Sequence, residues 1–281
     1  ECVRFIRENQ EQPFFLYFAH MYVHLPIYVQ EPFLRDSKNG PYGGAVACVD
    51  WSVRVLLHEL DRLGLDENTI VIFTSDNGSR GDHGGSNAPL RGHKGTTWEG
   101  GQRVPCIVRW KGQIDGGQER HDILSSIDFY ATLANIAGVD LPDDRAIDSI
   151  DQTELWQGGE GRRDTFLYFR KNTLEAVRKG RWKLHVSKWN WEAKADLEVC
   201  ELYDLQEDIG EENNVAEEYP DVVEQLQAVA AEAQEDLGDE RLGIEGKNVR
   251  PSGWKEDAEP LTEYDESYPF IMAEYDLPDR G

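Results

Sequence analysis

Two oxygen-bearing side chains follow a short apolar run in the first third of the sequence. Asp76 and Asn77 come directly after "TIVIFTS" and are followed by Gly78. A carboxylate and an amide carbonyl are hard oxygen ligands, which suit Ca²⁺ or Mg²⁺, whereas zinc prefers His and Cys. Taken alone, the Asp-Asn-Gly tripeptide also fits a hairpin or an Asx turn. Asp76 and Asn77 are therefore candidate metal ligands that need support from other residues.

A lysine and a histidine could act on an anionic substrate. Lys94 lies in "RGHKGTTWEGG", where small neighbours let an anion approach the backbone while the ammonium neutralises its charge. His24 lies in "YVHLP", and an imidazole there can donate to an anion or protonate a leaving group near neutral pH. Each residue alone fits a simpler role, a surface lysine and a structural histidine, and His20 nearby shows the same ambiguity.

Helical and strand patterns alternate around these residues and predict an α/β framework. Apolar residues recur at helical spacing from about 42 to 63, and the run "NTIVIF" then places Asp76 and Asn77 at the end of a strand. Ligands in open α/β sheets bind beyond the carboxyl ends of the strands. The continuous apolar run "FFLYFA" after Pro13 predicts a strand buried on both faces, which indicates a mostly parallel sheet.

The pattern changes after Pro142. Short strand-like pieces, "DTFLYFR", "LEAVRKG", "RWKLHV" and "CELYDL", are separated by turns, and a helix is predicted from about 220 to 237. We therefore expect two domains. Residues 1–155 would hold a mostly parallel sheet flanked by helices. Residues 156–281 would hold a small antiparallel sheet with a helix, followed by an extended tail packed by its aromatic side chains.

Charge and composition argue against several classes of partner. The 281 residues include 54 acidic and 29 basic side chains, a formal net charge of −25, which disfavours nucleic acid and anionic membranes. No apolar run approaches the length of a membrane span. The four cysteines are widely spaced without a CxxC pair, which indicates neither a zinc site nor a disulfide framework. An anionic substrate would therefore need a local basic pocket.

The order of the motifs resembles the formylglycine-dependent, type I sulfatases, the arylsulfatase-like family. The resemblance rests on "YFAHMYVHLP", "IVIFTSDNG" and "HKGTTWEGGQRVP", continues in "AVRKGRWKLH" and "CELYDLQED", and covers nearly the whole chain. It implies an alkaline-phosphatase-like α/β fold and hydrolysis of sulfate esters by a formylglycine made from cysteine or serine. It also favours a periplasmic, lysosomal or secreted protein.

The resemblance assigns roles to single residues. Asp76 and Asn77 would be two ligands of a calcium ion, with magnesium less favoured, and the ion would withdraw charge from the sulfate oxygens. Lys94 and His24 would bind the sulfate group and take part in catalysis. The ammonium of Lys94 can neutralise charge on the bridging oxygen, and protonated His24 can complete a general-acid step.

Parts of the family pattern are missing from this sequence. None of the four cysteines lies in the Cys- or Ser-x-Pro-Ser-Arg motif from which formylglycine is made, and the upstream acidic pair of metal ligands is absent. The chain begins at Glu1 without an initiator methionine or a signal peptide, so we expect it to be the carboxy-terminal portion of a longer protein. The chain by itself is then expected to be inactive.

Substrate and mechanism leave alternatives open. A sulfated small molecule and a sulfated carbohydrate are both expected partners. A phosphodiesterase or phosphonate hydrolase of the same superfamily shares much of the metal site, although the "HKGTTWEGG" block favours a sulfatase. A non-catalytic calcium-binding or glycan-binding module is the alternative from another class. His93 and the turn residues Arg80, Asp82 and His83 could line a substrate subsite or be ordinary loop residues.

Overall fold

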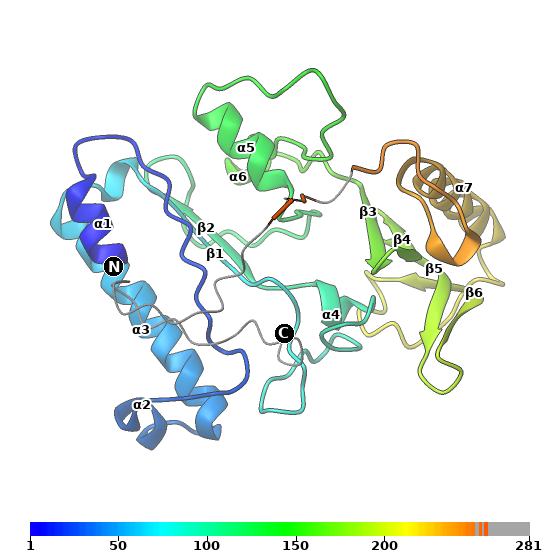
Figure 1. Cartoon of the computed structure of the whole chain (residues 1–281), viewed down its shortest axis with the longest axis horizontal. Helices are drawn as coiled ribbons and strands as arrows, with labels where there is room; N and C mark the ends of the chain where they lie inside the picture. The colour runs from blue at the N-terminus through cyan, green and yellow to red at the C-terminus, as the bar shows by residue number, and fades with distance from the viewer. Residues whose placement is uncertain (251–252, 255, 258–281) are drawn as a thin grey trace. The chain divides into compact units, whose positions relative to one another are not determined.

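Helices with one apolar face begin the chain. The structure, a computed structural model, describes residues 1–250, 253–254 and 256–257. Helix α1 (Cys2–Glu8) is followed by the short α2 (Glu31–Arg35) and the long α3 (Gly40–Arg62), which confirms the helix predicted for residues 42–63. Helices α1 and α3 lie side by side in Figure 1, and Ile6 of α1 and Leu60 of α3 are both buried.

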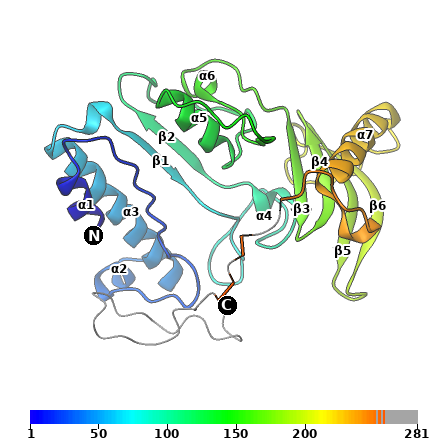
Figure 2. The same cartoon turned by 45° about the horizontal axis from the view of Figure 1, so that its top comes forward.

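Strands β1 (Ile70–Thr74) and β2 (Cys106–Trp110) form a two-stranded sheet whose strands are antiparallel, with Ile70 opposite Trp110 and Thr74 opposite Cys106. The parallel pairing expected for this part of the chain is therefore wrong for these two strands. A parallel partner needs a crossover connection, usually a helix, that carries the chain back across the sheet. Here an irregular loop, residues 75–105, connects the end of β1 to the start of β2 at the same end of the sheet. The loop includes the one-turn helix α4 (Glu99–Gln102). Figure 2 shows β1 and β2 running side by side.

The strand predicted for "FFLYFA" is also wrong. Residues 14–19 form no strand, and Phe15 and Tyr17 are 74% and 80% exposed. Phe14 packs against Phe5 of α1 with a ring-centroid distance of 6.0 Å, so only one side of the segment is covered. A strand buried on both faces needs paired neighbours, and no strand in the described part of the chain pairs with these residues.

A four-stranded antiparallel sheet in the order β3-β4-β5-β6 follows, as predicted for the second half. Its strands are β3 (Thr165–Arg170), β4 (Thr173–Lys179), β5 (Trp182–Asn190) and β6 (Ala195–Asp204). Helix α7 (Pro220–Leu237), also predicted, covers one face of the sheet in Figure 1. Leu174, Leu184 and Leu202 of the sheet are 0% exposed and pack with Leu226 of α7, so this layer has its own hydrophobic core.

Short helices connect the two sheets. Helix α5 (Asp128–Ile136) and helix α6 (Thr153–Trp156) lie between β2 and β3 in the sequence. The 3₁₀ turn η1 (Asp66–Asn68) precedes β1, and the 3₁₀ turn η2 (Glu240–Leu242) follows α7.

The fully buried carboxylate of Asp128 accepts two hydrogen bonds from Arg163, at 2.6 and 2.8 Å. It also accepts one from the backbone amide of Ser125 and one from that of Ile150. This charged side chain is thus paired, as a buried carboxylate must be.

Glu1–Asn248 form one compact unit. The boundary predicted near residue 155 stays a prediction. Most of the predicted aromatic-packed tail lies outside the described residues, and Trp254, which is described, is 81% exposed. No helix within the described ranges has both the length and the apolar character needed to cross a membrane.

Candidate active site

The carboxyl end of β1 presents the predicted metal ligands. Asp76 and Asn77 follow the last strand residue, Thr74, by two and three positions. Asp76 is exposed, and Ser75 Oγ donates to its Oδ1 at 3.3 Å. The amide nitrogen of Asn77 donates to the Gly78 carbonyl at 3.1 Å, which leaves its side-chain oxygen available to a cation. The antiparallel register brings this loop beside the start of β2, where the loop that carries Lys94 ends.

Lys94 lies in a tight turn formed by residues 93–96. Thr96 N and Thr96 Oγ1 both donate to the His93 carbonyl, at 3.0 and 2.8 Å. Gly95 has φ of +87°, which a residue with a Cβ rarely adopts, so the glycine permits the turn. The side chain of Lys94 is half-buried. The sequence therefore places the lysine on a constrained turn rather than on a free surface loop.

Backbone hydrogen bonds join the two loops. Lys94 N donates to the Ser79 carbonyl at 3.1 Å, and Gly78 N donates to the Gly101 carbonyl at 3.1 Å. A Cβ added to Gly78 would lie 1.8 Å from the carbonyl oxygen of Gly100, so only glycine fits this close approach. The structure therefore brings Lys94 and the segment of Asp76 and Asn77 into adjoining, mutually bonded loops.

Asn87, which sequence reasoning did not single out, adds a second link between these loops. Its side-chain oxygen accepts from Ser79 N at 2.8 Å, and its amide nitrogen donates to the carbonyls of Ser79 and Gly92 at 2.8 and 3.1 Å. No sequence signal identifies this role, because an asparagine in a polar loop is common and its partners are five and eight residues away.

His24 is exposed, and its Nδ1 lies 2.7 Å from the carbonyl oxygen of Leu25. Within the described residues, none of its hydrogen bonds reaches Asp76, Asn77 or Lys94. The neighbouring His20 lies 3.4 Å from Ser52 Oγ on α3, and burial lowers the pKa of its imidazole. The structure thus places three of the four predicted site residues in adjoining loops, and the roles of all four stay predictions.

Three of the four predicted subsite residues, Arg80, Asp82 and His83, contact one another, whereas His93 lies in the Lys94 turn. Arg80 donates to Asp82 at 2.8 Å, and this hydrogen bond lowers the pKa of the Asp82 carboxyl. His83 Nε2 lies 3.5 Å from Asp82 Oδ1. His93 Nδ1 lies 2.9 Å from the Lys94 carbonyl, so this ring accompanies the lysine turn. The subsite role of all four residues stays a prediction.

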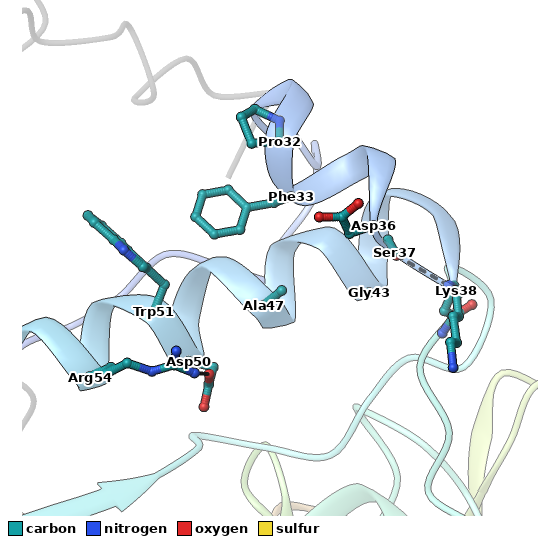
Figure 3. Close-up of a pocket in the computed structure, with 11 residues that line it drawn as sticks. Pro32, Phe33, Asp36, Ser37, Lys38, Gly43, Ala47, Asp50, Trp51 and Arg54 are labelled. Atoms are coloured by element: carbon teal, nitrogen blue, oxygen red, sulfur yellow. Dashed lines mark hydrogen bonds and ion pairs between the residues drawn. The ribbon is translucent and has the colours of Figure 1, made fainter.

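A cavity of about 490 Å³ lies between α2 and α3 (Figure 3). Phe33 and Trp51 flank it with ring centroids 6.1 Å apart, and Asp50 and Arg54 form an ion pair of 2.9 Å on its wall. Asn39, which also lines it, donates to the Gly84 carbonyl in the glycine-dense loop. The cavity therefore borders that loop, but none of the predicted site residues lines it.

The candidate metal ligands match calcium in kind but not in number. Both Asp76 and Asn77 offer hard oxygens, and no ion pair in the described part of the chain occupies the Asp76 carboxylate. A calcium ion takes about six to eight oxygen ligands. No group of three or more His, Cys, Asp or Glu side chains among residues 1–250 and the short described stretches after them could hold a metal ion. These two residues could therefore supply part of a calcium site.

The two sheets and their helices belong to the alkaline-phosphatase-like class of α/β folds, which the solved sulfatase structures similar to this chain share. Residues 1–139 match the sulfatase family model, and residues 93–236 match the model of the carboxy-terminal part of N-sulphoglucosamine sulphohydrolase. The chain belongs to the sulfatase family.

Relatives and solved structures agree with this assignment. N-acetylgalactosamine-6-sulfatase of Canis lupus familiaris is 40% identical over 209 residues, which cover 71% of this chain and 40% of that protein. Human steryl-sulfatase is 40% identical over 203 residues, which cover 69% and 34%. The crystal structure of the PsFucS1 sulfatase from Pseudoalteromonas sp. superposes with a TM-score of 0.77 at 29% identity, covering 83% of this chain and 51% of that one. The chain thus spans about 40% or less of the two curated relatives.

Proposed function

We propose that this chain is the carboxy-terminal portion of a sulfuric ester hydrolase whose formylglycine nucleophile is supplied by a segment upstream of it. The main observation in support is that two backbone hydrogen bonds join the loop of Asp76 and Asn77 to the loop of Lys94. Lys94 N donates to the Ser79 carbonyl, and Gly78 N donates to the Gly101 carbonyl. An ammonium and two oxygen ligands in adjoining loops suit a sulfate group bound beside a hard cation.

Each residue then has a defined task in splitting the S–O bond. Asp76 and Asn77 would hold Ca²⁺, which supplies Lewis-acid polarisation of the sulfate oxygens when bound. Lys94 neutralises the charge that grows on the bridging oxygen as the S–O bond breaks, and it does so without reorganising because its turn is already fixed. His24, when protonated, donates its proton to the leaving oxygen, so that the alcohol departs neutral.

The substrate is proposed to be a sulfated carbohydrate or another small sulfate ester. The two relatives reported above are named for sulfated N-acetylgalactosamine and for steryl sulfate, so the family match alone leaves both classes open. A sulfated sugar and an aryl or steryl sulfate present the same anionic group and differ only in the alcohol. The choice between them therefore depends on the walls around the sulfate position rather than on Lys94 or Asp76.

The test is the Lys94→Ala variant of the full-length protein, matured in a formylglycine-generating host and assayed with an aryl sulfate and with sulfated sugars. We expect kcat to fall at least about 10²-fold, the scale for losing a preorganised electrostatic stabiliser. Lys179→Ala is the matched control, because Lys179 is an exposed lysine of the four-stranded sheet. Unchanged turnover in Lys94→Ala would refute its proposed role.

Assays with phosphodiesters and phosphonate esters, together with calcium- and glycan-binding measurements, separate the alternatives. Preferential hydrolysis of a phosphodiester or a phosphonate ester would identify the sister activity of the superfamily. Calcium binding or glycan binding without hydrolysis of any ester would identify a non-catalytic module. The proposed sulfatase requires sulfate release that depends on both formylglycine maturation and Lys94.

A further inference from the structure

The turn that carries Lys94 continues into a segment buried against the four-stranded sheet. Thr97 and Glu99 are 4% and 2% exposed, although both are polar. The Thr97 hydroxyl donates to Glu175 Oε2 on β4 at 2.6 Å, and the Tyr168 hydroxyl on β3 donates to Glu99 Oε1 at 2.7 Å. Helix α4, which begins at Glu99, lies beside β3 in Figures 1 and 2. The lysine turn is thus bonded to strands that lie about 70 to 80 residues later in the sequence.

Lys183 on β5 is the centre of these contacts. Its side chain is fully buried, and its ammonium donates to the Thr97 carbonyl at 2.8 Å and to Glu99 Oε1 at 3.0 Å. Its third polar partner is Glu211 Oε1 at 2.8 Å, and it lies 4.0 Å from the centroid of the Tyr168 ring. The ammonium therefore makes two hydrogen bonds and an ion pair with a second carboxylate, so its buried charge is well compensated.

Glu211 completes the attachment from the other side. Its Oε2 accepts from the backbone amide of Glu99 at 2.8 Å, and its carbonyl accepts from Arg91 at 2.6 Å. The guanidinium of Arg91 stacks over the Trp98 ring at 3.8 Å. Lys183 and Glu211 therefore hold both ends of the loop from Arg91 to Glu99, with Lys94 between them.

Lys183 is one of two cations that pair with the buried carboxylates of Glu99 and Glu211. The carboxylates of Glu99 and Glu211 are buried, and Lys183 and the largely buried Arg178, 3.5 Å from Glu99 Oε2, provide the two opposing charges. Burial and the nearby Lys183 charge hold the pKa of His185 well below its ordinary value, so His185 adds no positive charge at neutral pH. Removing the Lys183 ammonium would leave the buried Glu211 carboxylate with only the imidazole of His185, 3.3 Å away, as an ion-pair partner among the described residues, which is unfavourable while that ring is neutral.

We propose that Lys183 is a positioning residue for Lys94: its buried ammonium ties the Thr97 carbonyl to the carboxylates of Glu99 and Glu211 and so fixes the turn that presents Lys94. The inference rests on the proposed catalytic role of Lys94. It makes the four-stranded sheet part of the catalytic machinery, because the sheet holds the lysine in place although it contributes no group to the substrate. Misplacement of a catalytic group by about 1 Å can cost about 10²-fold in rate.

The test compares Lys183→Met with Lys183→Arg in the full-length protein. Lys183→Met keeps the apolar stem and removes the charge, whereas Lys183→Arg keeps the charge. Hydrogen exchange is measured at the amides of Lys94 and Gly100, which donate to Ser79 and Arg91, and at sheet amides of β4 and β5 as a reference. We expect Lys183→Met to accelerate exchange in the loop at least about tenfold more than in the sheet, and Lys183→Arg to restore much of the protection.

Lys179→Met is the matched control, because it removes an exposed lysine from the same sheet and should leave loop exchange unchanged. If Lys183→Met does not fold, Glu211→Gln makes the same comparison, since the amide removes the charge and keeps the side-chain shape. Two results would overturn the proposal. One is hydrogen exchange that accelerates equally in the loop and in the sheet. The other is a folded Lys183→Met or Glu211→Gln variant in which hydrogen exchange of the loop is unchanged.

Kinetics supply the second measurement. Sulfate ester turnover by Lys183→Met should show a kcat reduced about tenfold or more and a KM changed much less, because the turn loses its fixed geometry rather than its ligands. Since hydrogen exchange does not depend on activity, a loosened loop with unchanged kcat would support the anchoring and refute the positioning role of Lys183, whereas the catalytic role of Lys94 itself is decided by Lys94→Ala. A protected loop would instead refute the anchoring alone.

Discussion

At the scale of single residues, the candidate site combines side chains that are held to different degrees. Lys94 is fixed through its own backbone amide and through the His93–Thr96 turn. Asp76 is exposed, and its carboxylate accepts one hydrogen bond from a described residue, its neighbour Ser75. An ammonium that neutralises charge in a transition state gains from a fixed position, whereas a metal ligand can be ordered by the metal it binds. The difference fits the roles proposed for the two residues.

The metal role is tested by Asp76→Ala in the full-length protein. We expect calcium affinity to fall at least about tenfold, because a carboxylate ligand and its negative charge leave the coordination sphere. Isothermal titration with Ca²⁺ measures the change. Asp140→Ala, which removes an exposed aspartate outside the site, should leave the affinity unchanged. Equal affinities in Asp76→Ala and the parent protein would show that Asp76 is no ligand.

The packing of the two loops is tested by Gly78→Ala. A methyl group 1.8 Å from the Gly100 carbonyl oxygen must displace one of the loops, so we expect a loss of stability of about 1–3 kcal/mol. Gly116→Ala is the control, since a Cβ there meets nothing within 4 Å. Denaturant unfolding of both variants measures the difference. A stable Gly78→Ala variant with full activity would contradict the close approach described here.

At the scale of elements, an ion-pair network joins α1 to α3. Glu59, 5% exposed, accepts from Arg7 of α1 at 2.6 Å and from Arg62 of α3 at 2.5 Å. These hydrogen bonds, with that from Arg7 the stronger influence, lower the pKa of the Glu59 carboxyl from 4.5 to about 2. A carboxyl whose pKa is lower in the folded protein stabilises the fold above its unfolded pKa and loses that contribution as the pH falls.

We therefore expect Glu59→Gln to lower the Tm at pH 7, and the gap from the parent protein to narrow as the pH falls from about 4.5 to about 2. Thermal melts at a series of pH values measure this gap. Glu11→Gln, which changes an exposed glutamate near α1, should leave the Tm unchanged at every pH. A gap that stays constant across the series would show that the Glu59 charge does not stabilise the helix pair.

At the scale of the whole molecule, the 281-residue chain by itself is expected to hydrolyse no sulfate ester. Ester cleavage needs a nucleophile, and no cysteine or serine in this sequence lies in the motif that formylglycine formation needs. Two oxygen ligands would also bind calcium weakly. An aryl sulfate assay with calcium compares the chain with its own Lys94→Ala variant. Turnover above that variant would show that the nucleophile lies within these residues.

The sequence alone determined the local elements and the chemistry of the site. The helices α3 and α7 and the four strands β3 to β6 were predictable because periodicity and turn residues are local signals. The motifs around Asp76 and Lys94 were enough to predict the sulfatase family, which the family models confirm. Residue type also restricts which side chains can bind a cation or an anion, whatever the fold around them.

Only the tertiary structure decided which elements pair and which residues anchor the site. The direction of β2 relative to β1 and the exposure of Phe15 depend on which segments lie alongside, and no local pattern contains that information. Lys183 is an ordinary strand lysine in the sequence, and only the fold buries it against Glu99 and Glu211. A buried charge is stable only with its partners, and these partners come from positions 28 to 84 residues away, so their contact is a property of the fold.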